Sequence, residues 1–290
     1  MKVLVTGGTT GQLYSELLRT CPDAIEIVST GGERLDITDA SAVDAAVSDL
    51  SPAYIINAAA YTAVDNAEEE KNRDAAYAVN EHGVANIATA AASAGAGLIH
   101  VSTDFVFGDM PATPIRTDAP TDPVSVYGKS KLAGEQRLLA LMPQDSLIVR
   151  TAWVYSSFGN NFVKTMLRLM NERDEVGVIA DQVGSPTWAN GLAAALWRAV
   201  ETKSTGILHW TGAGVASWYD FAQAILEEGK ACGLIDNDRV FVNPLRTDQY
   251  PTPAARPSYS VLETSVTRAE LGIKPVHWRE ELREMLRELT

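Results

Sequence analysis

Short apolar runs alternate with helix-length segments along the first half of the chain. The pattern predicts strands at 3–5, 24–28, 54–57, 98–102 and 146–150, and helices at 12–19, 40–50, 74–94 and 126–141. Strands that are mostly apolar and alternate with helices indicate a parallel sheet covered on both faces. Because crossover connections are right-handed, the simplest fold is a doubly wound α/β fold of the Rossmann type.

The alternation loosens after Arg150. Helices are expected there at 162–171, 189–201, 218–228 and 278–289, and short strands at 176–179, 206–210 and 239–242. Residues 1–150 are therefore expected to form a dinucleotide-binding domain. Residues 151–290 are expected to form mainly a smaller, C-terminal substrate-binding domain that is partly interwoven with the first.

A glycine-rich turn connects the first strand to the first helix. The segment from Thr6 to Leu13 reads TGGTTGQL, so glycines lie where a backbone could approach a pyrophosphate. The cofactor-binding residues expected here are Gly8, Thr10, Gly11, Gln12 and Leu13. Tyr14 takes the place of the third glycine of the dinucleotide motif, which predicts a shifted helix or an altered turn. A plain βα turn is the alternative.

The end of the second strand bears on the choice of cofactor. It carries Ser29 and Thr30 where a carboxylate would bind the ribose hydroxyls of NAD, and Arg34 follows. Hydroxyls and a guanidinium suit a 2′-phosphate, so NADPH is expected, and NADH stays open. Asp36 and Ile37 are expected on the adenine side of the cofactor, with helix capping as an equal alternative for Asp36.

A tyrosine and a lysine lie four residues apart at the start of a predicted helix. Tyr127 and Lys131 therefore share a helix face, where an ammonium would lower the pKa of a phenol. A phenol tuned in this way can donate a proton near neutral pH. Thr103 ends a buried strand, the place where doubly wound proteins bind ligands, and could hold the oxygen that Tyr127 protonates.

Several further motifs occur in a characteristic order. They are NAAAYTAVD at 57–65, VN at 79–80, STDFVF at 102–107, YGKSK at 127–131 with GE at 134–135, RTAWVY at 150–155, GNNFV at 159–163, DQVGSPT at 181–187, and ARP at 255–257. Together they resemble the dTDP-4-dehydrorhamnose reductase family of the extended short-chain dehydrogenase/reductase superfamily, across nearly the whole chain.

The resemblance implies roles for particular residues. Thr103, Tyr127 and Lys131 would carry out catalysis, with Tyr127 and Lys131 also contacting the cofactor. Cofactor contacts after the third strand would come from Ala58, Ala59 and Tyr61. The sugar and nucleotide sides of the substrate would be bound by Val64, Asp104, Trp153, Asn161, Gln182 and Arg256.

The resemblance also implies a reaction. It is the reduction of the carbon-4 ketone of dTDP-4-dehydro-L-rhamnose to dTDP-L-rhamnose, a precursor of cell-surface polysaccharide, by hydride transfer from NAD(P)H. The chain departs from the family pattern at Phe105, where a tyrosine is usual, and this change removes a hydroxyl from the sugar pocket.

Two other functions stay open. A nucleotide-sugar dehydratase or epimerase would use the same scaffold, but a dehydratase is expected to carry Asp-Glu after the threonine, and here Asp104 is followed by Phe105. A non-catalytic regulatory subunit of the methionine adenosyltransferase type would also share this superfamily's sequence features. The complete set of Thr103, Tyr127 and Lys131 favours an enzyme.

Composition excludes several other classes. The net charge of −13 and the scattered lysines and arginines argue against a nucleic-acid partner. No apolar stretch approaches the length of a membrane span, and no leader pattern precedes the first strand, so a cytoplasmic protein with reduced cysteines is expected. The four histidines have no metal-ligand spacing, and no metal site is assigned. All tryptophans except Trp153 are interpreted as packing residues, and a homodimer is compatible with the sequence.

Overall fold

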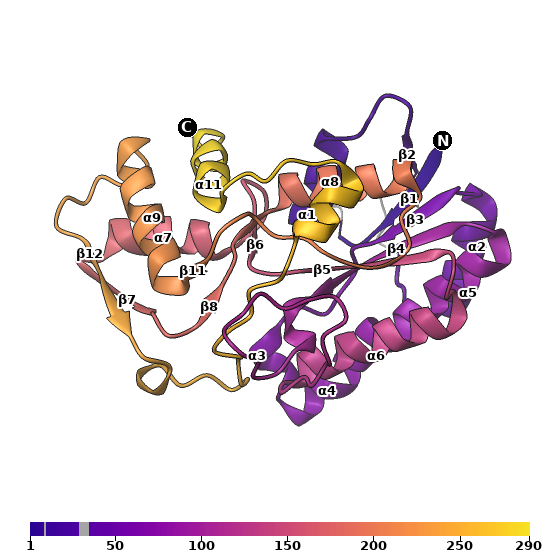
Figure 1. The fold of residues 1–290 in the computed structure, drawn as a ribbon, viewed down its shortest axis with the longest axis horizontal. Helices are drawn as coiled ribbons and strands as arrows, with labels where there is room; N and C mark the ends of the chain where they lie inside the picture. Colours follow the sequence, from indigo (N-terminus) through magenta and orange to yellow (C-terminus); the bar gives the residue numbers. More distant parts are fainter. Residues whose placement is uncertain (9, 29–34) are drawn as a thin grey trace.

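The computed structural model describes residues 1–8, 10–28 and 35–290 (Figure 1). Six parallel strands form the central sheet in the order β10-β5-β4-β3-β1-β2. Their bounds are β1 (Lys2–Thr6), β2 (Glu26–Val28), β3 (Tyr54–Asn57), β4 (Gly97–Thr103), β5 (Ser146–Thr151) and β10 (Gly206–His209). The predicted doubly wound α/β fold is confirmed.

Alternate residues of the strands build two separate cores, because successive side chains of a strand point to opposite faces of the sheet. Val3 and Val5 of β1 pack with helices α1 (Gln12–Arg19) and α8 (Ala189–Thr202) on one face. Leu4, between them, packs on the other face with α2 (Ala40–Leu50), α5 (Val84–Ala94) and α6 (Val126–Leu141). Both faces are therefore covered, as a parallel sheet requires.

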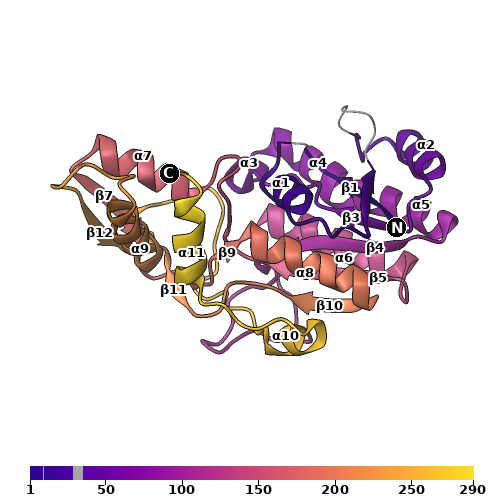
Figure 2. The same cartoon turned by 90° about the horizontal axis from the view of Figure 1, so that it is seen from above.

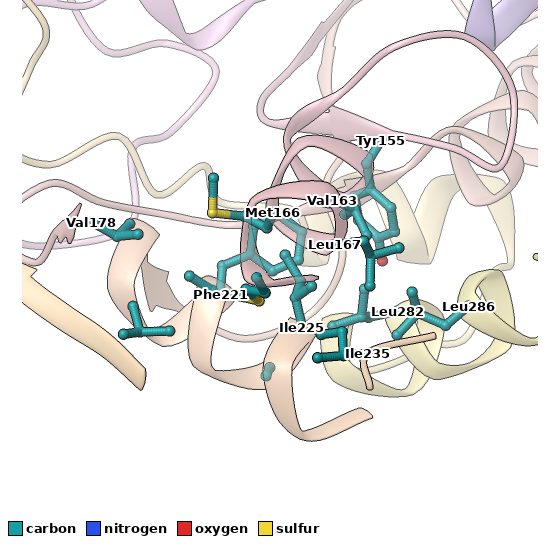
Figure 3. Close-up of a cluster of buried hydrophobic side chains, with 14 of the residues drawn as sticks. Tyr155, Val163, Met166, Leu167, Val178, Phe221, Ile225, Ile235, Leu282 and Leu286 are labelled. Carbon is teal, nitrogen blue, oxygen red and sulfur yellow. The ribbon is translucent and has the colours of Figure 1, made fainter. Parts of the chain in front are cut away.

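A second group of elements lies to one side of the sheet (Figures 1 and 2). It contains α7 (Phe162–Glu172), α9 (Trp218–Ala231), α11 (Trp278–Arg287) and the parallel pair β7 (Glu175–Ile179) and β12 (Phe241–Leu245). Its own apolar core, drawn in Figure 3, includes Phe221 and Leu282, both fully buried. Two short pairs join it to the sheet region: β6 (Val154–Tyr155) with β9 (Thr187–Trp188), and β8 (Val183–Gly184) with β11 (Ala216–Ser217).

The two halves of the sequence are interwoven in the sheet. Strand β10 pairs with β5, with Gly206 beside Leu147, and α8 covers the sheet together with α1. The last third of the chain therefore completes a layer that the first 150 residues begin. A division into two domains near residue 150 stays a prediction.

The segment 74–94 differs from its predicted single helix. It is divided into α4 (Glu70–Tyr77), a wider π-helical turn η1 (Ala78–Gly83), and α5. The wider turn accompanies the side chain of Asn80, which bonds the backbone of Tyr61 in both directions. The structure also adds elements that the pattern did not predict: α3 (Val64–Ala67), η2 (Asp104–Val106), η3 (Thr247–Gln249) and α10 (Ser265–Leu271).

Two further features concern membrane-spanning helices and the cysteines. Among the described residues, no helix combines the length and the apolar character that crossing a membrane requires. Cys21 and Cys232 are both free thiols.

A buried carboxyl connects α11 to the sheet region. Glu281 is 8% exposed, and its oxygens lie so close to Gly191 and Gly212 that a Cβ at either glycine would stand within 3.0 Å of them. Burial raises the pKa of Glu281 to about 7, although Arg268 and a backbone hydrogen bond at Trp188 act to lower it. The carboxyl is therefore protonated in the folded protein at pH values where the unfolded chain has already ionised.

This carboxyl predicts a pH-dependent gain in stability for Glu281→Gln. The pKa of Glu281 is 4.5 in the unfolded chain, the ordinary value, and about 7 in the folded protein. Between these two pH values the unfolded chain ionises while the folded protein keeps its proton, so the contribution of Glu281 to stability falls as pH rises. Glutamine cannot ionise, so the variant should match the wild type near pH 4.5 and exceed it by roughly 1–3 kcal/mol at pH 8. Urea denaturation across this range measures the difference. Glu280→Gln, on the exposed side of α11, is the control, and a parallel pH dependence of both variants would contradict the prediction.

Candidate active site

The order of strands reverses between β1 and β3, and ligands of doubly wound folds bind at such a switch point. Gly7 follows β1 with φ +119°, and a Cβ there would meet the backbone of Ala58 at 3.3 Å. The N–H of Gly11 donates to the carbonyl of Gly8 at 2.8 Å and closes the turn. Helix α1 then begins at Gln12 without a side-chain cap, so its first N–H groups can receive an anion. These features fit a dinucleotide pyrophosphate.

The residue in place of the third glycine is accommodated by packing. Tyr14 is 9% exposed and belongs to the core between the sheet and α8. Helix α1 still begins at Gln12, as the sequence predicts, and Leu13 packs against the same core. The bulky side chain is therefore directed away from the turn, and Thr10 lies exposed on it.

The adenosine side of the predicted cofactor site is only partly described. Ser29, Thr30 and Arg34 lie outside the described residues. The carboxylate of Asp36 accepts hydrogen bonds from the backbone N–H and hydroxyl of Thr38, whereas Asp39 caps α2. Ile37, 3% exposed, packs in the core. The adenine-side roles of Asp36 and Ile37 stay predictions.

Two of the three predicted catalytic residues meet at the end of β4. Thr103 ends the strand, and Tyr127 is placed in the first turn of α6, which Ser125 caps. Burial raises the pKa of Tyr127 to about 12. A hydrogen bond with Thr103 opposes this shift, and the nearby Asp104 adds to it. The phenol is therefore protonated and desolvated at neutral pH.

Asp104 is the buried acid of this site. It is 2% exposed, and its Oδ1 accepts the hydroxyl proton of Thr103 at 3.0 Å. Burial raises the pKa of Asp104 to about 6, against opposing hydrogen bonds from Ser260 and Thr103. A carboxyl with this pKa can present either an acceptor or a donor to a sugar hydroxyl near neutral pH.

The third predicted catalytic residue is directed elsewhere. Lys131, 1% exposed, donates to the carbonyl of Val101 at 2.8 Å, and its Nζ lies 3.2 Å from Nε2 of His100. In this arrangement burial dominates the pKa of Tyr127, and Nζ of Lys131 is held by β4, so the expected lowering of the Tyr127 pKa by Lys131 stays a prediction. Sequence reasoning missed His100, which was considered only as a metal ligand.

Helix α6 is fixed to the sheet by a buried ion pair. Glu135 of α6 contacts Arg150 of β5, with N···O distances of 2.7–3.2 Å, and both side chains are at most 4% exposed. The hydroxyl of Ser102 donates to the same carboxylate at 2.5 Å. Such a pair fixes the height of α6 relative to the ends of β4 and β5.

The loop after β3 is attached to α6 through Asn80. Its side chain accepts from the N–H of Tyr61 at 2.8 Å and donates to the Tyr61 carbonyl and to Ser130. Tyr61, predicted along the cofactor path, is therefore joined to α6 through Asn80 and Ser130, and Ala58 and Ala59 precede it directly after β3. The motif VN at 79–80 was the sequence signal for Asn80, although its role was not predicted.

Two of the predicted substrate residues line one cavity of about 660 Å³. Gln182 and Arg256 reach it from separate loops, and Asp65 of α3 forms an ion pair with Arg256 at 2.8 Å. The pKa of Asp65 is lowered overall, although burial opposes this, by hydrogen bonds from Arg256 and Ala254. The cavity therefore presents two arginines, Arg173 and Arg256, and the amide of Gln182 to a ligand in an otherwise acidic chain.

Trp218 also lines this cavity, so its interpretation as a packing residue is incomplete. Its ring stacks on Trp153, with centroids 3.7 Å apart and planes 13° apart. Trp153 has φ +50°, a left-handed conformation that is rare for an aromatic residue. The strained backbone directs the Trp153 ring onto Trp218 and Gly184.

The remaining predicted substrate residues are divided between two places. Val64 belongs to an apolar cluster with Tyr127 and with Phe105, whose ring meets that of Tyr127 edge-on at 5.5 Å. Asn161 caps α7 and donates to the side chain of Gln12, at the start of α1, at 3.0 Å. Val64 is thus beside Tyr127, and Asn161 lies beside Gln12, at the end of the glycine-rich turn.

The fold, the glycine turn and the Thr103–Tyr127 pair define a member of the extended short-chain dehydrogenase/reductase class. A family model described as RmlD substrate binding domain matches residues 1–290, and the chain belongs to this family. A dTDP-4-dehydrorhamnose reductase of Aggregatibacter actinomycetemcomitans is 41% identical over 98% of both chains. The resemblance inferred from the motifs is confirmed.

Solved structures show the same similarity. A dTDP-4-dehydrorhamnose reductase from Clostridium acetobutylicum has a TM-score of 0.92 at 40% identity, covering 100% of this chain and 99% of that one. The Bacillus anthracis dTDP-4-dehydrorhamnose reductase, solved in complex with NADP, has a TM-score of 0.89 at 37% identity, covering 99% of both chains.

The contact between α6 and η2 predicts that Gly128→Ala is destabilising. A Cβ at this position would stand 2.2 Å from the carbonyl oxygen of Phe105, which is backbone and cannot rotate away. Overpacking of this kind costs roughly 1–3 kcal/mol, so the free energy of unfolding from urea denaturation should fall by that amount. Lys129→Ala, at the exposed neighbouring position, is the control. Equal stability of the two variants would show that α6 can shift freely.

Proposed function

We propose that the protein reduces the carbon-4 ketone of dTDP-4-dehydro-L-rhamnose to dTDP-L-rhamnose, with NADPH as hydride donor and Tyr127 as proton donor. The observation that carries the proposal is the desolvated Thr103–Tyr127 pair at the end of β4, on the same edge of the parallel sheet as the glycine turn after β1, in a chain that matches named reductases over its full length. NADH is the alternative donor. The reaction would take place in the cytoplasm and would supply a precursor of cell-surface polysaccharide. The proposed assembly of the enzyme is a homodimer.

The bound nicotinamide would supply the hydride. The residues of the chain would provide placement and the proton. Thr103 would orient the ketone oxygen, and Tyr127, protonated because of its raised pKa, would donate to that oxygen as the negative charge develops. Lys131, four residues further along the same helix face, would then stabilise the phenolate of Tyr127.

The substrate is proposed to extend from Tyr127 to the 660 Å³ cavity. Val64, Asp104 and Trp153 would contact the sugar, whereas Asn161, Gln182 and Arg256 would serve the nucleotide and diphosphate. Arg256 is held by Asp65 at 2.8 Å, so an anionic diphosphate would compete with Asp65 for the guanidinium. A preformed guanidinium at a fixed position costs little entropy on binding.

Two observations weigh against the other functions. A dehydratase needs an acid and a base after the threonine, but Phe105 occupies the second position and packs edge-on against Tyr127. A non-catalytic subunit has no requirement for a desolvated tyrosine beside Thr103. Turnover separates the two classes.

The direct test is to add freshly generated dTDP-4-dehydro-L-rhamnose (dTDP-4-keto-6-deoxy-L-mannose) and to follow the absorbance of NADPH or NADH. Substrate-dependent oxidation of the cofactor, with dTDP-L-rhamnose as the product, supports the proposal. Cofactor binding without turnover would support the regulatory-subunit alternative instead.

Tyr127→Phe should abolish most turnover while cofactor binding stays near normal, because the phenolic proton is needed only in the chemical step. General acid catalysis is worth roughly 100- to 10,000-fold, and steady-state kcat together with cofactor titration measures both effects. A variant that keeps more than about a third of the wild-type kcat would remove Tyr127 from the mechanism.

NADPH should be preferred over NADH by about tenfold in kcat/KM, the worth of one charge-assisted contact at a partly exposed site. Ser29 and Thr30 carry no charge that would repel a 2′-phosphate, and Arg34 could bind it. Ser29→Asp or Thr30→Asp should reverse the preference, and Arg34→Ala should reduce it. A higher kcat/KM with NADH in the wild type, or an unchanged ratio in Arg34→Ala, would contradict this prediction.

A further inference from the structure

Lys131 belongs to a chain of buried polar groups that crosses three neighbouring strands. Its Nζ lies 3.2 Å from Nε2 of His100 on β4, and Nδ1 of His100 lies 3.1 Å from Nδ2 of Asn57 on β3. Oδ1 of Asn57 accepts from Thr6 at the end of β1 at 2.7 Å. Lys131 is 1% exposed, and His100 and Asn57 are fully buried. Each of their N–H groups must therefore find a hydrogen-bond acceptor within the protein.

The orientation of the Asn57 amide is fixed by a backbone group. The N–H of Ala59, which can only donate, points at Oδ1 of Asn57 at 3.1 Å. If the amide were flipped, its NH₂ group would face this N–H, donor against donor. The NH₂ group of Asn57 therefore faces His100 and donates to its Nδ1.

This donor fixes the tautomer of His100. Complete burial is the largest cause that lowers the pKa of His100 well below its ordinary value, so the imidazole is neutral and carries one proton. Since Nδ1 accepts from Asn57, that proton is on Nε2 and points at Nζ of Lys131. An ammonium at Nζ would place two donors face to face, whereas a neutral amine accepts the proton of His100 with its lone pair.

We propose that His100 is a positioning residue that holds Lys131 against β4 whenever the lysine is the neutral amine, and that couples protonation of the lysine to its release. Taking up one proton from solvent converts the amine to an ammonium, which can keep the carbonyl of Val101 but not the N–H of His100. The ammonium would then turn toward Tyr127, where the proposed function requires it. The proposal depends on that function only for this last, catalytic consequence.

The other charged groups near Lys131 permit this equilibrium. Burial lowers the pKa of Lys131 to about 8, and Glu135 opposes this effect. The carboxylate of Glu135 is already bound by Arg150 and Ser102. Tyr127, earlier on α6, is uncharged at neutral pH, and the buried Asp104 of η2 acts on Tyr127 rather than on Lys131.

The first experiment reads the tautomer of His100 without any substrate. Protein labelled with ¹⁵N in its histidine rings is examined by long-range ¹H–¹⁵N correlation between pH 6 and 9, and the His100 signal is assigned by its loss in His100→Gln. The expected result is that the His100 ring is neutral and carries its proton on Nε2 from the pH at which Lys131 begins to titrate up to pH 9. A proton on Nδ1 throughout, or a charged ring, would overturn the proposal.

The second experiment titrates Lys131 through ¹³C-labelled lysine side chains. In His100→Gln an amide oxygen replaces the N–H that faces Nζ, so the titration of Lys131 should move to higher pH by about one unit. His100→Met, which fills similar space without an acceptor of that strength, is the control and should not move it upward. An unchanged titration in His100→Gln would overturn the proposal.

The pH profile of turnover reports the catalytic consequence. If charged Lys131 assists Tyr127, kcat/KM falls as pH rises through the pKa of Lys131, and this alkaline limb should move upward in His100→Gln by the same interval. A moved lysine titration with an unmoved limb would refute the link to catalysis. Because the two spectroscopic measurements need no substrate, failure of the proposed reductase activity would leave their result standing.

Discussion

The buried ion pair between Glu135 and Arg150 is the contact on which the geometry of the site depends. It joins α6 to β5 at a depth where neither side chain reaches solvent, so breaking it would leave a buried charge unpaired. Tyr127 and Lys131 lie on the same helix, and Thr103 lies on the strand next to β5. Gly128 and Gly134 allow α6 to approach the backbone of Phe105 and Asn80 closely. The distance between Tyr127 and Thr103 therefore follows from the packing of α6 on the sheet and not from the conformation of a loop.

Depth of burial also sets the acid–base character of the site. Tyr127 and Asp104 both have raised pKa values and Lys131 a lowered one, and desolvation is the largest cause in each case. All three shifts favour the uncharged form. At neutral pH Tyr127 is therefore uncharged, whereas Asp104 and Lys131, with pKa values of about 6 and about 8, each exchange a proton within about one unit of neutrality.

The sequence predicted most of the sheet and its helices, because short apolar runs and segments of helix length are local properties of the chain. It placed Thr103 and Tyr127 correctly at strand and helix ends, since both follow from the βα order. The π-helical turn at Ala78–Gly83 was not predicted, because an alanine-rich helix and a helix with one wider turn have similar patterns. The contacts of Trp218 and His100 were also missed, since both depend on partners far apart in the sequence. Residues 29–34, on which the predicted choice of cofactor depends, lie outside the described residues.

The position of β10 has a consequence for folding of the chain during its synthesis on the ribosome. Until residues 206–209 have emerged, the outer edge of β5 has no neighbour, and until α8 has emerged the Val3–Val5 face of the sheet lacks much of its cover. An unpaired, apolar edge strand is the kind of surface that nascent chains present to chaperones or to one another. The first 150 residues are therefore dependent on the later chain, and a protein truncated at that point would keep an adhesive edge that the full-length chain covers with its own β10.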